Sequence, residues 1–119
     1  MNTKSKVTDK TLKEIEGITG AKLTLGKLIW SIRQADNVPQ RGFAEVLGIT
    51  KQQLCDIEHD RKSVSPKLAA SYAKILGYSE EQFVRLALQD LIDRSGLNLQ
   101  VEISPRNRKK GDLPHFRTI

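Results

Sequence analysis

The sequence predicts an all-α fold, and three observations favour this fold over a sandwich or barrel. Aromatic residues make up only 5% of the 119 residues, so the core must come mainly from Leu, Ile, Val and Ala. Apolar residues recur at helical spacing, as in Leu25, Leu28, Ile29 and Ile32. Helix-capping residues and glycines bound the segments with this spacing. A chain of this length has room for one domain of ordinary size.

Residues 1–23 are predicted to form an N-terminal arm that precedes the domain. Thr8 or Asp9 can cap a short amphipathic helix that runs to about Glu16, and Gly17 ends it. Residues 24–95 are predicted to form the domain, and residues 96–119 a C-terminal strand followed by a basic tail.

The domain is predicted to contain five helices, each with a local signal at its start. Ser and Thr favour the cap position because their side-chain oxygen accepts a hydrogen bond from a free backbone N–H of the first turn. Pro39 stops the first helix, Gly77 the fourth and Gly96 the fifth. The five helices begin, in order, after Thr24, at Gln40, at Thr50, after Ser65 (with Pro66 first in the helix) and after Ser79.

The stretch 40–58, QRGFAEVLGITKQQLCDIE, has the residue spacing of a helix-turn-helix. Two such helices cross at roughly 90–120° through a turn of about 3–4 residues. Ala44 suits their closest approach because it is small, and Gly48 suits the turn because glycine adopts a left-handed conformation at low cost. Two amphipathic helices joined at a glycine would explain any one of these residues, but rarely all of them in register. The apolar residues that can hold the pair in place are Val46, Leu47, Ile49, Leu54 and Ile57.

This pattern resembles the Cro/Xre-type family of phage-repressor-like DNA-binding domains over about residues 24–93. The resemblance implies a compact five-helix, lambda-repressor-like domain. It also implies an ion pair between Arg33 and Glu58, which would tie the first helix of the domain to the second helix of the motif. Three features depart from the family, and one of them is Gly42 inside the first turn of the first motif helix. Pro39 replaces the usual Ser or Thr before the motif, and His59-Asp60 replaces the frequent Asn-Gly after it.

In this geometry the second motif helix enters the major groove with its N-terminal residues at the base edges. Gln52 can bind adenine through two hydrogen bonds, Lys51 can donate to guanine, and Asp56 can accept from cytosine or bridge instead to Lys51 or Arg41. Each basic residue nearby could equally be an ordinary solvated charge. The predicted base contacts are Lys51, Gln52, Gln53 and Asp56, and the predicted phosphate contacts are Gln40, Arg41, Thr50, Arg61, Lys62 and Lys67.

The positive charge is concentrated at the two ends of the chain. The net charge is +6, whereas residues 14–103 are close to neutral. Basic arms are attracted to nucleic-acid phosphates without reading sequence, but they can also solubilise the chain or dock an acidic partner. Residues 97–103, LNLQVEI, alternate apolar and polar as in a half-buried strand. The predicted contacts with a second copy or another partner are therefore Leu97, Leu99, Val101 and Ile103.

The sequence disfavours an enzyme, a metal site and a cofactor site. His59 and His115 have no cysteine cluster at ligand spacing, and glycine-rich nucleotide loops are absent. Cys55 and His59 lie one helical turn apart, but on the surface expected to face DNA rather than in a pocket. A single cysteine excludes an intramolecular disulfide and fits a reducing cytoplasm. No apolar run approaches the roughly 18–20 residues of a membrane span.

The resemblance implies a sequence-specific transcriptional repressor that binds a palindromic double-stranded operator as a homodimer. Short proteins of this build resemble HigA-type antitoxins, which repress their own operon and neutralise a small toxin, so a cognate toxin is an expected partner. Two alternatives remain at this stage. One is a stand-alone phage or mobile-element repressor, and the other is a protein-binding adaptor without specific DNA binding.

Overall fold

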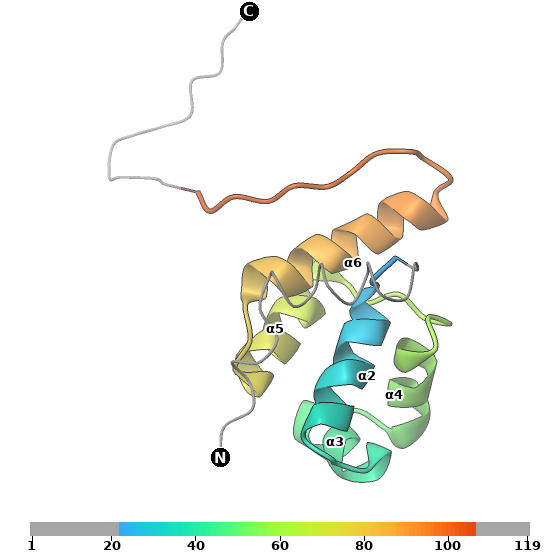
Figure 1. Ribbon diagram of the computed structural model, residues 1–119, viewed down its shortest axis with the longest axis vertical. Coiled ribbons are helices and arrows are strands. Elements are labelled where there is room, and N and C mark those ends of the chain that lie inside the picture. The colour runs from blue at the N-terminus through green and yellow to red at the C-terminus, as the bar shows by residue number, and fades with distance from the viewer. Residues whose placement is uncertain (1–21, 107–119) are drawn as a thin grey trace, which may run out of the picture.

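The computed structural model describes residues 22–106, and within this range it contains five α helices and no strand, which confirms the all-α prediction (Figure 1). The predicted helix near residues 8–16 and most of the basic tail lie outside the described residues. None of the described helices is long and apolar enough to span a membrane. The helices are α2 (Leu25–Ala35), α3 (Gln40–Leu47), α4 (Lys51–Glu58), α5 (Pro66–Leu76) and α6 (Glu80–Arg94).

The helices begin where the sequence places hydroxyl caps, except at α3. The side-chain oxygens of Thr24, Ser65 and Ser79 each accept a hydrogen bond from the backbone N–H three residues further on, at 3.1–3.2 Å. Pro39 precedes α3 and offers no side-chain cap, so the start of this helix lacks that hydrogen bond. Gly48 ends α3 in a left-handed conformation with φ 76°, as the turn of the motif requires.

Aliphatic residues build most of the core, and α2 lies at its centre. α2 packs against both α4 and α6, so it joins the α3–α4 pair to the α5–α6 pair (Figure 1). Its predicted stripe is almost fully buried, and Phe83 of α6 is buried against the same cluster. The largest fully buried side chains are Leu28, Ile29, Ile32, Leu54 and Phe83.

The tightest approach between helices lies at Gly26, a residue to which the sequence analysis gave no role. A Cβ atom added there would overlap the carbonyl oxygen of Ile57 and come within 2.7 Å of Asp60 Oδ1. Glycine therefore allows α2 to lie directly against the last turn of α4. Ala44, the predicted small residue of the α3–α4 crossing, is 1% exposed.

The strand predicted at residues 97–103 does not form within residues 22–106 of the single chain. The segment is extended but is not paired with another strand, and it runs back along α6 (Figure 1). A strand needs a second backbone as its partner, and all the other described elements are helices. The side chain of Gln89, on α6, supplies hydrogen bonds in place of that backbone.

Candidate nucleic-acid interface

The turn between α3 and α4 holds α4 so that one side is buried and the other faces solvent. Ile49 N–H donates to the carbonyl of Ala44 (3.0 Å) and closes the turn. Thr50 and Gln53 form a capping box. Thr50 Oγ1 accepts from Gln53 N–H (3.0 Å), and Gln53 Oε1 accepts from Thr50 N–H (2.8 Å). Leu54 and Ile57 anchor the buried side in the core.

The N-terminal turn of α4 is open to solvent. Lys51, Gln52 and Gln53 are all exposed, as side chains that contact base edges must be. The capping box occupies the carbonyl oxygen of Gln53, so this amide has only its NH₂ group left for a base. Gln52 and Lys51 are therefore the better placed of the predicted base contacts.

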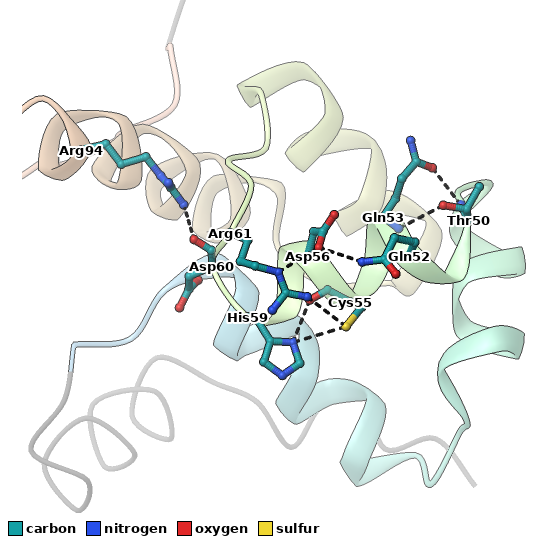
Figure 2. Close-up of polar contacts among 9 residues, drawn as sticks. All are labelled: Thr50, Gln52, Gln53, Cys55, Asp56, His59, Asp60, Arg61 and Arg94. Carbon is teal, nitrogen blue, oxygen red and sulfur yellow. Dashed lines mark hydrogen bonds and ion pairs between the residues drawn. The ribbon is translucent and has the colours of Figure 1, made fainter.

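Asp56 organises a small polar network on the exposed side of α4 (Figure 2). Its Oδ1 accepts from Gln52 Nε2 at 3.0 Å and from Arg61 Nε at 2.9 Å. The hydrogen bond from Arg61 is the main reason that the pKa of Asp56 lies below its ordinary value, and the same bond raises the pKa of Arg61. Lys51 or Arg41 was one possible partner of Asp56 on the sequence alone, and the structure places Arg61 there instead because the chain turns back after α4.

Cys55, His59 and Arg61 lie beside this network. Arg61 Nη2 donates to Cys55 Sγ at 3.3 Å, and His59 Nδ1 lies 3.6 Å from the same sulfur (Figure 2). His59 Nδ1 also lies 2.9 Å from the carbonyl oxygen of Cys55. In the described part of the chain, no three His, Cys, Asp or Glu side chains gather in a way that could hold a metal ion.

The structure brings Arg33 and Glu58 together in a buried ion pair. Arg33 Nε donates to Glu58 Oε2 at 2.7 Å, and Arg33 Nη2 donates to Oε1 at 3.0 Å. Gln40 Nε2 also donates to Oε1 (2.9 Å), and Arg33 Nη1 donates to the carbonyl of Val38 (3.0 Å). Three segments are thus tied together, and they are α2, the start of α3 and the end of α4.

Gln40, a predicted phosphate contact, is half-buried, and one N–H of its side-chain amide donates to Glu58. The second N–H of that amide is left for a phosphate, so its predicted role stays a prediction. Thr50, also predicted to contact phosphate, uses its hydroxyl oxygen to cap α4. The bond from Gln40 to Glu58 depends on how α3 packs against α4, whereas the cap at Thr50 is a local contact that the sequence predicts.

Three further predicted phosphate contacts come from the segments before and after α4. Arg41 lies on α3, Lys62 follows α4 and Lys67 is the second residue of α5, and all three are exposed. None of them forms an ion pair with another described residue. Cations that are not already neutralised are the groups best suited to phosphate oxygens.

A contact that the sequence does not predict anchors the chain just after the C-terminal end of α4. Arg94, in the last turn of α6, donates from Nη2 to the carbonyl of Asp60 at 2.8 Å (Figure 2). Asp60 has φ 60° and turns the chain out of α4. The contact fixes the end of α4 to α6, and no local sequence signal connects residues so far apart.

Comparison with known proteins gives one match. Residues 31–83, which include the C-terminal part of α2, all of α3, α4 and α5, and the start of α6, match the model of a helix-turn-helix family. No curated protein and no solved structure matches the chain.

Proposed function

We propose that this chain, a DNA-binding transcription regulator whose residues 31–83 form a Cro/C1-type helix-turn-helix domain, is a sequence-specific repressor. The observation that carries the proposal is the exposed N-terminal turn of α4, held rigid by the capping box between Thr50 and Gln53. A rigid helix end that presents donors and acceptors to solvent, with unpaired cations on both sides, fits a DNA major groove.

The polar network on α4 supports specific roles for two side chains. Asp56 uses one N–H of the Gln52 amide and so fixes the orientation of that amide. The other N–H and the carbonyl oxygen of Gln52 are left for a base, and together they match N7 and N6 of adenine. Lys51 lies beside Gln52 and is exposed, so it can donate to guanine. Because the carboxylate of Asp56 is already shared by two donors, its own contact with cytosine is the weaker proposal.

A selection of bound sequences from random duplex DNA, followed by binding assays on single-base variants, tests this proposal. Gln52→Ala is expected to relax preference at one base pair, at a loss of about 1–3 kcal/mol of discrimination. Lys62→Ala is expected to weaken binding to all sequences alike and to reduce the salt slope by about 0.9. Arg61 is less suitable for this test, because removing it also frees Asp56.

Lys74→Ala provides a matched control for the loss of one positive charge. Lys74 is exposed on α5, beyond the segments that surround α4, and forms only a long contact of 4.0 Å with Glu80. The Lys74→Ala variant should leave both the affinity for DNA and the base preference unchanged. Binding that is independent of sequence at physiological salt would contradict the repressor proposal and favour an adaptor without specific DNA binding.

We further propose that the protein acts in the cytoplasm as an autoregulatory, HigA-type antitoxin. The support is a set of exposed apolar side chains, none of them on α4, that a partner protein could cover. A gene for a small toxin beside this one, with co-purification of the two products at equal stoichiometry, would support the antitoxin. Specific DNA binding without such a partner would favour a stand-alone phage or mobile-element repressor. The exposed apolar residues that precede the C-terminal segment are Trp30, Val46, Leu68, Ile75 and Leu91.

Specific binding by so small a recognition surface also supports a homodimer on a palindromic operator. Two copies would place their α4 helices about 34 Å apart, one turn of the duplex, and would double the number of bases contacted.

A further inference from the structure

The extended segment Leu97–Ile103 is held in place by one buried side chain. Gln89, on α6, is only 6% exposed, and both ends of its amide are used. Its Nε2 donates to the carbonyl of Leu99 at 2.8 Å, and its Oε1 accepts from Val101 N–H at 2.7 Å. This pair of hydrogen bonds resembles what a neighbouring strand would supply. The segment is therefore already in the conformation of a strand before any second strand is present.

The Gln89 contact determines which backbone groups lie on the opposite edge. In an extended chain, successive residues direct their N–H and C=O groups to opposite sides. Because Leu99 and Val101 face Gln89, the backbone groups of Asn98, Gln100 and Glu102 face away from α6. Within residues 22–106 these groups have no hydrogen-bond partner. We call this side of the segment the outer edge.

We propose that the outer edge pairs antiparallel with the outer edge of a second copy of this chain, about a two-fold axis at Gln100. The inference rests on the proposed homodimeric repressor and specifies its interface. In this register Gln100 lies opposite the second copy's Gln100, and Asn98 lies opposite Glu102. The pairing would form about six backbone hydrogen bonds, all from groups that the single chain leaves unpaired.

The side chains of the segment are self-complementary in this register. Leu97 would lie opposite Ile103 and Leu99 opposite Val101, so apolar residues meet apolar residues on one face. Leu97 and Leu99 are 51% and 60% exposed in the single chain and would be covered. A surface that matches itself about a two-fold axis is the requirement for a symmetric dimer, and this is why a second copy fits better than an unrelated protein.

Charge selects this register over the one centred on Glu102. Glu102 is the one charged residue of the segment, and here it faces Asn98, whose amide can donate to it. A register centred on Glu102 would place two carboxylates opposite each other, which is destabilising.

Sedimentation equilibrium on the full chain and two variants of Asn98 tests the register. Asn98→Lys would place two ion pairs with Glu102 in the dimer, and we expect tighter self-association at low salt. Asn98→Asp would oppose two pairs of carboxylates, and we expect a dimer dissociation constant at least tenfold higher. Asn98 is exposed, so circular dichroism should show an unchanged fold for both variants. Equal dissociation constants for the two variants, or a chain that stays monomeric at high micromolar concentration, would overturn the proposal.

Disulfide cross-linking gives an independent test in a Cys55→Ser background, which removes the native cysteine. Two Cα atoms opposite each other in a hydrogen-bonded pair are about 5.5 Å apart. This separation suits a disulfide. Gln100→Cys should therefore cross-link to itself. Asn98→Cys is the matched control, because its own copies would lie about four residues apart along the strand, roughly 13 Å. Cross-linking of the control instead, or of neither variant, would reject the register.

These outcomes can be separated from a failure of the proposed function. A monomer that binds a half-site with base preference would refute this interface and leave the DNA-binding proposal intact. A dimer that forms the expected cross-link but shows no sequence preference in DNA binding would support this interface and refute the proposed repressor function. Occupation of the outer edge by another part of the same chain would give a compact monomer in which neither variant of Asn98 changes the association state, and this result also refutes the proposal.

Discussion

Replacing Glu58 with Gln is expected to destabilise the domain strongly, because it leaves the buried guanidinium of Arg33 without a counter-charge. The Glu58 side chain is 1% exposed and that of Arg33 is 11% exposed. The carboxylate accepts three hydrogen bonds, two from Arg33 and one from Gln40. A glutamine amide at position 58 would keep one acceptor oxygen. Its NH₂ group, itself a donor, would face the N–H donors of Arg33 or Gln40. Breaking such a buried pair from one side costs about 3–5 kcal/mol.

Urea unfolding, monitored by the circular dichroism of the helices, measures this loss in the free energy of unfolding. For a domain of this size a loss of 1 kcal/mol lowers Tm by about 4–8 °C, so Glu58→Gln should lower it by more than about 12 °C. The double variant Arg33→Met with Glu58→Leu removes both charges, and it should recover most of the lost stability. Glu80→Gln is the control. Glu80 forms an exposed contact with Lys74, and its loss should cost less than about 1 kcal/mol.

A cost below about 1 kcal/mol for Glu58→Gln would refute this reasoning, since it would mean that the ion pair is hydrated or replaceable. A double variant as unstable as the single one would also refute it, because the cost would then come from lost packing and not from an unpaired charge.

Three further predictions follow from the same part of the structure. Gly26→Ala should cost at least about 1–3 kcal/mol by thermal unfolding, because the new methyl group overlaps the carbonyl of Ile57, and a wild-type Tm would contradict this. The pKa of Asp56, followed by NMR, should rise toward its ordinary value of 3.8 in Arg61→Gln. The folded-state pKa is depressed, so the stabilising contact is present above pH 3.8 and is lost as the pH falls below it. Thr50→Ala should cost about 1 kcal/mol through loss of the α4 cap and should weaken DNA binding, whereas unchanged stability would show that the cap is dispensable.

The amino-acid sequence predicts the helices and most of the buried side of each, although Val46, which was expected to help hold the motif helices in place, is 57% exposed. The caps at Thr24, Thr50, Ser65 and Ser79, and the left-handed turn at Gly48, act within a few residues of each other, so they can be recognised locally. Helical spacing of apolar residues likewise predicts which face is buried, because burial follows from hydrophobicity whatever the partner. The resemblance added the pairing of Arg33 with Glu58, which no local pattern could supply.

The polar groups that meet across helices follow from the tertiary structure. Asp56 bonds to Arg61, and Gln40 bonds inward to Glu58, because the chain direction after α4 and the packing of α3 against α4 set those distances. The alternation at residues 97–103 predicted an extended chain but could not supply the second backbone that a strand needs, and a side chain from α6 took its place. Local patterns determine conformation, whereas hydrogen-bond partners depend on the positions of residues far apart in the sequence.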